Sequence, residues 1–163
     1  MIQFSVVIPT LNEVENIDPL LIRLFDLDLP PGNFEVIFVD DGSLDGTPEK
    51  IHVWEGRANV RLVERKARPN LTASILAGVA VARSNVVVVM DADLSHPPER
   101  LPAIVAPVLD GNYDVAIGSR YVLGGGTEGG PPHRQWLSRI CDWLARPVCG
   151  VDDATSGFFA FRR

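Results

Sequence analysis

Two short apolar runs that each end in a pair of carboxylates constrain the fold of this chain more than any other feature. The first reads FEVIFVDD, Phe34 to Asp41, and the second reads VVVVMDAD, Val86 to Asp93. A nearly continuous apolar run of this length is typical of a strand that is buried on both faces, as in parallel sheets covered by helices. The sequence therefore predicts an α/β fold with acidic residues at the ends of buried strands.

The periodicity of apolar residues alternates between strand and helix along the rest of the chain. The strand-like segments are 4–9, 34–39, 60–64, 86–90, 113–117 and 156–161, and the helix-like segments are 16–25, 47–54, 71–82, 98–109 and 136–148. This alternation predicts a mostly parallel sheet between two helical layers, a three-layer α/β/α arrangement. With 163 residues, of which 46% are hydrophobic, we expect a single domain over residues 1–163.

Composition argues against several classes of protein. The net charge is −6, whereas nucleic-acid-binding proteins usually carry a basic face, so we expect no nucleic-acid partner. No apolar run approaches the ~18 residues of a membrane span, and the first residues lack the basic region of a signal peptide. Cys141 and Cys149 fall in one helix-like stretch, where we interpret them as core residues of a protein in a reducing cytoplasm.

Polar residues follow four of the predicted strands. They are Pro9, Asn12 and Glu13 after the first strand, Asp40 and Asp41 after the second, Asp91 and Asp93 after the fourth, and Gly118, Ser119 and Arg120 after the fifth. In open parallel sheets, ligands bind beyond the carboxyl ends of the strands. The sequence therefore predicts a ligand site at this edge of the sheet.

The spacing of Asp91 and Asp93 raises an electrostatic problem. Residues two apart in an extended chain point to the same side, and two unit charges about 4 Å apart repel by about 4 kcal/mol at an effective dielectric constant of about 20. A divalent cation that prefers oxygen ligands, Mg²⁺ or Mn²⁺, would offset this repulsion. The alternative is a turn in which both carboxylates are solvated or cap the next helix, and the pair alone leaves both interpretations open.

Asp40 and Asp41 pose a similar choice. Adjacent residues of a strand point in opposite directions, so one carboxylate would face a ligand while the other caps the turn through Gly42. The alternative is that this acidic pair only shapes the turn.

Five short motifs occur in a fixed order, each at the end of an expected element. They are VVIPTLNE at 6–13, VDDGS at 39–43, DAD at 91–93, GSRY at 118–121 and TSGF at 155–158. Together they resemble the GT-A-fold inverting glycosyltransferases of the family 2 type, most closely the dolichol-phosphate and polyprenyl-phosphate mannosyltransferases. Each motif alone is weakly specific, but the five in order cover nearly the whole chain.

The resemblance implies roles for particular residues. It implies nucleotide binding by Pro9, Leu11, Glu13, Val39, Asp40, Asp41, Asp91 and Ala92. It implies a metal site at Asp91, Asp93 and Ser95, with Mg²⁺ or Mn²⁺ as cofactor. It implies acceptor-phosphate contacts from Arg120, Arg134, Ser138 and Arg139. Asp91, Asp93, Arg120 and Arg134 are the residues that it would make catalytic.

The implied reaction transfers a sugar from a nucleoside-diphosphate donor to a polyprenyl or dolichyl phosphate at the cytoplasmic face of a membrane. GDP-mannose is the expected donor, and a UDP-sugar is the alternative. The acceptor phosphate is already ionised near neutral pH, so no strong general base is required. We interpret His96 as shaping the loop before Pro97 and Pro98, whereas Asp152 and Asp153 are either contacts to the acceptor or sugar, or a capped turn.

The chain departs from the family pattern at several positions. Leu11 stands where many relatives have Tyr, Ser95 where they often have Gln, and Asn70 where Gly is common. The chain ends at Arg163, whereas relatives continue beyond the Ser-Gly-Phe strand, so we expect it to be truncated at its C-terminus. A nucleotide-sugar-binding fragment without turnover therefore remains an alternative to an active enzyme.

Three other α/β classes fit the sequence poorly. A dinucleotide oxidoreductase needs a Gly-x-Gly-x-x-Gly turn after the first strand, where this chain has PTLNE. A phosphoacceptor signalling domain would carry its acid pair after the first strand and a lysine after the fifth. A nucleotidyltransferase usually has a glycine-rich basic loop after the first strand, and Asn12 and Glu13 stand there instead.

Overall fold

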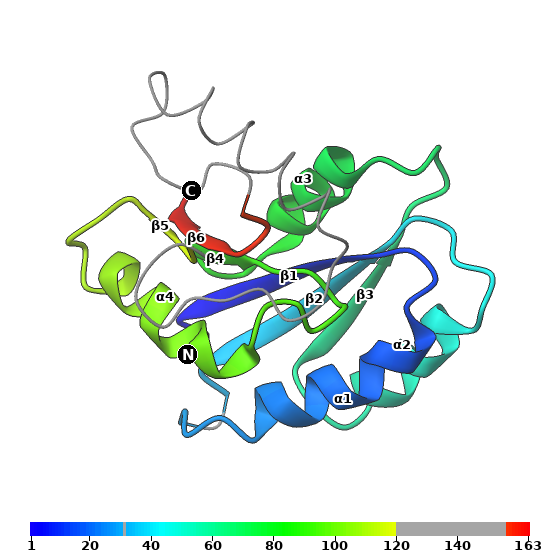
Figure 1. Ribbon diagram of the computed structural model, residues 1–163, viewed down its shortest axis with the longest axis horizontal. Helices are drawn as coiled ribbons and strands as arrows, with labels where there is room; N and C mark the ends of the chain where they lie inside the picture. Colours follow the sequence, from blue (N-terminus) through cyan, green and yellow to red (C-terminus); the bar gives the residue numbers. More distant parts are fainter. Residues whose placement is uncertain (31, 120–155) are drawn as a thin grey trace, which may run out of the picture.

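Within residues 1–30, 32–119 and 156–163, which the computed structural model describes, six strands form one sheet between two layers of helices (Figure 1). The strands are β1 (Phe4–Thr10), β2 (Phe34–Asp40), β3 (Val60–Glu64), β4 (Val86–Val89), β5 (Val115–Ile117) and β6 (Phe159–Arg162). The helices are α1 (Val14–Phe25), α2 (Thr47–Glu55), α3 (Leu71–Val81), the short 3-10 helix η1 (Pro98–Arg100) and α4 (Leu101–Leu109). The predicted three-layer α/β/α arrangement is confirmed.

The strand order across the sheet is β3-β2-β1-β4-β6-β5. β1 pairs in parallel with both β2 and β4, and β2 pairs in parallel with β3. Only β6, among the described strands, runs antiparallel to its neighbours β4 and β5. The chain thus builds outward from β1 in one direction and then returns to place β4 on the other side of β1. Such a reversal of strand order marks where open α/β sheets bind ligands.

The two faces of the sheet bury different sets of side chains. On one face, Val6 and Ile8 belong to a core that includes Leu20 of α1 and Leu101 of α4. On the other face, Val7 belongs to a smaller core against which Ile75 and other residues of α3 pack. Figure 1 shows the same division, with α3 on one side of the sheet and α1, α2 and α4 on the other.

Gly78 allows α3 to lie unusually close to the sheet. A Cβ atom at this position would lie 2.4 Å from Cγ1 of Val7 and 3.0 Å from Cγ2 of Val39. Real Cβ atoms do not approach that closely, so a side chain here would push the helix away from β1 and β2. This contact explains the glycine in the middle of a small-residue helix.

Glu35 is the charged exception in the apolar run of β2, and it is fully buried. Its Oε1 accepts hydrogen bonds from the Ser5 hydroxyl (2.7 Å) and the Arg83 backbone N–H (2.7 Å). Its Oε2 accepts a hydrogen bond from Arg61 Nη1 at 3.3 Å. Because Ser5 and Glu35 lie near the starts of β1 and β2, this ion-paired cluster sits at the opposite end of the sheet from the predicted site.

Several predicted element boundaries differ from the structure by a few residues: α1 begins at Val14 rather than at residue 16, and β6 begins at Phe159 rather than at residue 156. The helix predicted to begin at residue 47 does so, and Gly46, with a φ of 97°, is its N-cap. The Thr47 hydroxyl is engaged elsewhere, because it donates to Asp45 Oδ1 (2.6 Å) and accepts from the Glu13 N–H (2.9 Å). The fifth strand begins at Val115, two residues later than predicted, because the turn that ends α4 continues through the hydrogen bond from the Tyr113 N–H to the Pro107 carbonyl.

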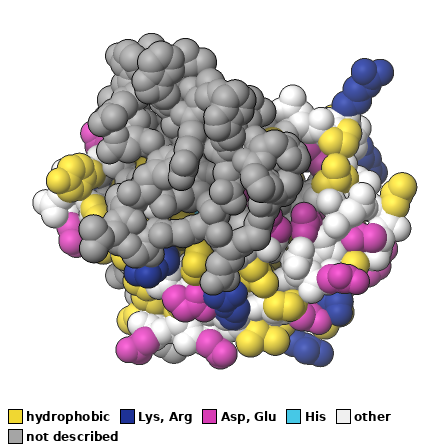
Figure 2. Space-filling model, viewed as in Figure 1, with side chains coloured by type: hydrophobic (Ala, Val, Ile, Leu, Met, Phe, Trp, Pro, Cys, Tyr) yellow, Lys and Arg dark blue, Asp and Glu magenta, His cyan; other side chains and the backbone are white. Residues whose placement is uncertain are grey.

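The predicted helix at 136–148 lies outside the described residues, together with Cys141 and Cys149. Among the helices that the structure describes, none is long and apolar enough to cross a bilayer. On the described part of the face in Figure 2, acidic and basic side chains are mixed rather than gathered into one basic patch.

We expect Gly78→Ala to lower the free energy of unfolding by about 1 to 3 kcal/mol, because the added methyl group would overlap Val7. In a helix interior without such a contact, the same change gains up to about 1 kcal/mol. The matched control is Gly56→Ala, since Gly56 has a φ of −79° and nothing would lie within 4 Å of its Cβ. Urea denaturation should show a loss for the first variant only; equal stability of the two would contradict the packing argument.

Candidate functional site

The carboxyl ends of β1, β2 and β4 meet at one edge of the sheet, as predicted. β1 lies between the other two, and the register pairs Thr10 with Asp40 on one side and Val7 with Val89 on the other. The segments that follow these strands, 11–13, 41–46 and 90–97, therefore begin side by side. Three of the motifs found in the sequence are brought together at this edge.

The loop after β1 is tied to the loop after β2. The backbone N–H of Asn12 donates to the Ser43 hydroxyl (2.8 Å), and the N–H of Leu44 donates back to Asn12 Oδ1 (2.9 Å). Asn12 has a φ of 58°, a left-handed conformation that asparagine tolerates better than most residues. The N–H of Glu13 also donates to the Thr47 hydroxyl. Together these hydrogen bonds hold Leu11 and Glu13 in a fixed position relative to the end of β2.

Asp40 organises the turn after β2. Its side chain is 1% exposed. Oδ2 accepts from the N–H groups of Gly42 (2.9 Å) and Ser43 (2.8 Å), while Oδ1 accepts from the hydroxyls of Ser43 and Thr10. A carboxylate offers about four acceptor positions, and these four donors fill them. The structure thus favours the turn-capping interpretation of Asp40, and its implied role in nucleotide binding stays a prediction.

Asp41 has a different environment, although it is also nearly buried. Its Oδ1 forms an ion pair with Nη1 of Arg65, and its Oδ2 accepts a hydrogen bond of 2.7 Å from the N–H of Asn70. Burial alone would raise the pKa of this carboxyl, but the Asn70 amide, the Ser74 hydroxyl and the Arg65 guanidinium outweigh it and hold the pKa below its usual range. Asp41 is therefore an ionised carboxylate near neutral pH.

Asp91 and Asp93 lie beyond the end of their strand. β4 ends at Val89, so the extended-chain argument that both carboxylates point the same way does not apply. The Asp91 side chain is 43% exposed, and its Oδ2 lies 3.4 Å from Nε2 of His96. Asp93 is exposed, and its Oδ1 accepts a hydrogen bond of 3.0 Å from the N–H of Ser95.

The start of β6 packs against the Asp91 side chain. A Cβ atom on Gly157 would lie 2.6 Å from Asp91 Oδ2, so a side chain at this position would displace the carboxylate. The His96 ring, which is next to the same carboxylate, lies against the Phe158 ring with a centroid distance of 5.4 Å. His96 therefore connects Asp91 to the segment that leads into β6, while its role in shaping the loop stays a prediction.

The Asp91 and Asp93 carboxylates suit a hard divalent cation, since they supply oxygen ligands that are accessible to solvent. Within the described residues, no group of three or more His, Cys, Asp or Glu side chains is placed to hold a metal ion. A cation bound to these two carboxylates would complete its coordination with water and substrate phosphate oxygens, as Mg²⁺ commonly does. The implied ligand role of the Ser95 hydroxyl stays a prediction.

The remaining predicted residues divide into three groups. Val39 and Ala92 are buried, so neither presents its side chain at the edge. Pro9 is half-buried, and Leu11 is 44% exposed at the end of β1. The residues that lie outside the described part of the chain are Arg120, Arg134, Ser138, Arg139, Asp152 and Asp153.

Sequence analysis missed Arg65, Asn70 and Gly157 as parts of this edge. Arg65 directly follows β3, so its place at the same edge as Asp41 was open to prediction from the strand order. Asn70 caps α3, with its Oδ1 accepting from the Ala73 N–H at 2.9 Å, and asparagine before a helix is a recognised capping signal. The contact of Gly157 with Asp91 depends on the antiparallel return of β6, which has no local signature in the sequence.

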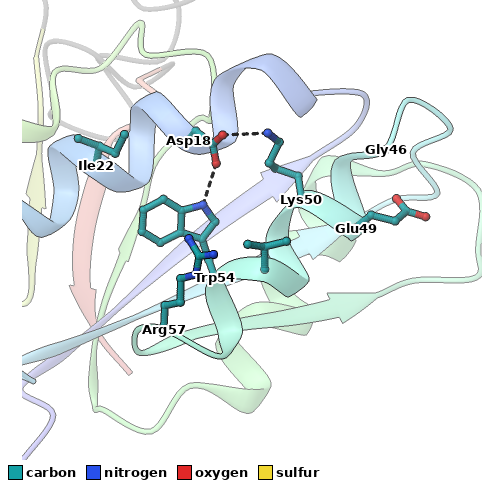
Figure 3. Close-up of a pocket in the computed structure, with 8 residues that line it drawn as sticks. Asp18, Ile22, Gly46, Glu49, Lys50, Trp54 and Arg57 are labelled. Atoms are coloured by element: carbon teal, nitrogen blue, oxygen red, sulfur yellow. Dashed lines mark hydrogen bonds and ion pairs between the residues drawn. The ribbon is translucent and has the colours of Figure 1, made fainter.

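A groove of about 650 Å³ lies between α1 and α2, away from the acidic edge (Figure 3). Asp18 of α1 lines the groove and accepts hydrogen bonds of 2.8 Å from both Lys50 Nζ and Trp54 Nε1 of α2. The hydrogen bond from Lys50, followed by that from Trp54, lowers the pKa of Asp18. None of the predicted site residues lines this groove, and its polar groups serve to join the two helices.

Comparison with known proteins gives three kinds of match. Residues 5–163 match the family model described as Glycosyl transferase family 2. The dolichol-phosphate mannosyltransferase of Pyrococcus furiosus is 39% identical over 98% of this chain and 46% of its own length. That of Saccharomyces cerevisiae is 36% identical over 99% of this chain and 61% of its own length. The chain thus spans about half to three-fifths of these curated relatives.

Two solved structures share the fold. A mannosyltransferase from Pyrobaculum calidifontis, in complex with GDP-Man and Mn²⁺, has a TM-score of 0.70 and 24% identity over 99% of this chain and 44% of its own. Glucosyl-3-phosphoglycerate synthase from Mycobacterium tuberculosis, in complex with Mn²⁺, UDP and glucosyl-3-phosphoglycerate, has a TM-score of 0.71 and 25% identity over 98% of this chain and 56% of its own. With its GT-A fold and its match over residues 5–163, the chain belongs to glycosyltransferase family 2.

Proposed function

We propose that this chain forms the nucleotide-sugar-binding part of a metal-dependent glycosyltransferase that transfers a sugar to a polyprenyl phosphate. The observation that carries the proposal is the meeting of ionised Asp41 with Asp91 and Asp93 at the switch point of strand order. The names of the curated relatives support a dolichol-type acceptor and mannose as the sugar. The motif resemblance favours GDP-mannose as the donor.

A UDP-sugar is the second candidate donor. The M. tuberculosis synthase, whose structure contains Mn²⁺ and UDP, supports this alternative as well as the divalent cation. Leu11 also stands where many relatives carry tyrosine, so an aromatic contact with the base is missing at this position. The two donors share the diphosphate, and they differ in the base that Asp41 and its neighbours would contact.

The described residues have separate tasks in this reaction. Asp91 and Asp93 would hold Mg²⁺ or Mn²⁺, which supplies a Lewis acid for the diphosphate leaving group. Asp41 offers a fixed ionised acceptor for N–H or O–H donors of the nucleoside. Glu13, whose Oε2 accepts from Asn16 Nδ2 at 2.6 Å, offers a second carboxylate nearby. Arg120 and Arg134 are proposed to bind phosphate charge.

The reaction inverts the configuration of the sugar by direct attack of the acceptor. An ionised phosphate oxygen of the acceptor forms the new bond to the sugar carbon, and the nucleoside diphosphate departs with the electrons of the broken bond. No protein group has to remove a proton, because the attacking phosphate is already an anion. A binding fragment without turnover is the alternative, and sugar transfer by this chain would exclude it.

The first test is a calorimetric titration of GDP and UDP into the protein, with Mn²⁺ and separately with EDTA. We expect one of the two nucleotides to bind, and to bind more tightly with Mn²⁺, because Asp91 and Asp93 would hold a cation that offsets the charge of the diphosphate. The nucleotide that binds identifies the class of donor. Failure of both nucleotides to bind under either condition would contradict the proposal.

Asp93→Ala should remove the Mn²⁺-dependent part of nucleotide binding and leave the fold intact, because Asp93 is exposed and outside the secondary structure. The matched control is Asp28→Ala, which removes an exposed carboxylate from the loop that precedes β2. The ratio of the dissociation constants in EDTA and in Mn²⁺ is the readout for both variants. A ratio in Asp93→Ala equal to that of Asp28→Ala would exclude Asp93 as a metal ligand.

Asp41→Asn should weaken nucleotide binding in both Mn²⁺ and EDTA by roughly ten- to a hundredfold, because a hydrogen bond to a charged group is worth about 1.5 to 3 kcal/mol. The contrast with Asp93→Ala separates nucleoside contacts from metal contacts in the same assay. If Asp41→Asn changed only the Mn²⁺-dependent part, Asp41 would belong to the metal site instead.

A further inference from the structure

We infer that Arg65 is a positioning residue for recognition of the nucleotide base, acting through Asp41. It holds the buried Asp41 carboxylate in one orientation, so that the remaining acceptor capacity of that carboxylate is available to N–H donors of the base. The inference rests on the proposed function and extends it to the base-binding part of the site. Neither the motifs nor the family resemblance pointed to Arg65.

The contrast between the two adjacent aspartates is the first observation. Asp40 receives three hydrogen bonds within its own turn, from Gly42 and Ser43, and a fourth from the Thr10 hydroxyl at the end of β1. On Asp41, Arg65 and the Asn70 N–H each occupy one acceptor position, on different oxygens, and the Ser74 hydroxyl interacts with the same carboxylate. Since a carboxylate offers about four such positions, Asp41 keeps acceptor capacity that Asp40 lacks. Only the second aspartate can therefore serve a ligand.

The environment of Asp41 makes it dependent on a cation. Its side chain is 7% exposed, and burial favours the neutral, protonated form of a carboxyl group. A protonated Asp41 would present an O–H donor where a base N–H needs an acceptor. The Asn70 N–H and the Ser74 hydroxyl favour the ionised form, and the Arg65 guanidinium adds the only opposing charge among these three groups, so together they maintain the form of Asp41 that can accept hydrogen bonds.

Arg65 is itself held in place by several contacts. Its side chain is 15% exposed, and Nη1 donates to Ser74 Oγ (2.9 Å) and to the Asn70 carbonyl (3.4 Å). Its backbone N–H donates to the Asp40 carbonyl at 2.8 Å. The guanidinium thus joins the end of β2 to the start of α3. Because Nη1 contacts both Asp41 Oδ1 and Ser74 Oγ, the guanidinium orients the carboxylate as well as pairing with its charge.

The ligand chemistry that fits is a base with an N–H group on its pairing edge. Guanine offers two neighbouring N–H groups and uracil offers one. In the proposed function, Asp91 and Asp93 would hold the cation that offsets the charge of the donor diphosphate. Asp41 therefore has no part in binding the diphosphate. A change at Arg65 should therefore affect the nucleoside and leave the diphosphate unaffected.

The test uses Arg65→Met, Arg65→Lys and the matched control Arg61→Met. Arg61 lies on β3, the strand that Arg65 directly follows, and pairs with another buried carboxylate, Glu35, at the opposite end of the sheet. The probes are the nucleotide that the unmodified protein binds and inorganic pyrophosphate, which lacks a base. Both are titrated in the presence of Mn²⁺, at about pH 8 and about pH 5.5, which brackets the range where a buried carboxyl without its cation partner titrates.

We expect Arg65→Met to weaken nucleotide binding by roughly tenfold or more, with pyrophosphate binding unchanged. The loss relative to the unmodified protein should be larger at the lower pH, because Asp41 without its cation becomes protonated. Arg65→Lys should keep the pH profile of the unmodified protein, since it keeps the charge, but should bind the nucleotide less tightly because the ammonium lacks the fork. Arg61→Met should leave both affinities unchanged.

Equal losses of nucleotide and pyrophosphate affinity in Arg65→Met, or losses matched by Arg61→Met, would show a purely structural role and overturn the inference. If Arg65→Met does not fold, Arg65→Lys decides by the same comparison of nucleotide with pyrophosphate. If the unmodified protein binds pyrophosphate with Mn²⁺ but neither nucleotide, the base-binding role is wrong while the metal site stands. If it binds none of the three, the proposed function fails and this inference fails with it.

Discussion

The parallel pairing of β1 with both β2 and β4 is the constraint on which the rest of this structure depends. It brings the ends of three strands, and the acidic residues that follow two of them, to one edge of the sheet. The close approach of α3 at Gly78 covers one face, and α1, α2 and α4 cover the other. Because both faces are covered, the carboxyl edge is where the described part of the sheet can present polar groups to a ligand.

Four aspartates at one edge would repel one another, and the structure gives them different surroundings. The Asp40 carboxylate is stabilised by hydrogen bonds from its own turn, and the Asp41 carboxylate is paired with the guanidinium of Arg65. Asp91 and Asp93 are left partly or fully exposed, in the region where a cation would offset their charge. The apolar strands thus end in carboxylates because each pair serves a separate task, one shaping the nucleoside end of the site and the other the phosphate end.

The sequence predicts the fold and the edge of the site well, because apolar periodicity and the residues after each strand are local signals. It predicts contacts between distant segments poorly. Arg65 approaches Asp41 from a different strand, and the contact of Gly157 with Asp91 requires the antiparallel return of β6. The expectation that Asp91 and Asp93 share a direction assumed an extended strand, and β4 ends at Val89, before either residue.

The central claim is that a nucleoside diphosphate and a divalent cation bind together at the carboxyl edge of β1, β2 and β4. Paramagnetic broadening of backbone amide signals by Mn²⁺, recorded by NMR with and without the bound nucleotide, tests it most directly. We predict that bound nucleotide raises the affinity for Mn²⁺. The broadened amide signals should centre on Asp91, Asp93 and Gly157 and extend to the segments after β1 and β2. Broadening centred on the groove between α1 and α2, or spread over exposed carboxylates without regard to nucleotide, would contradict it.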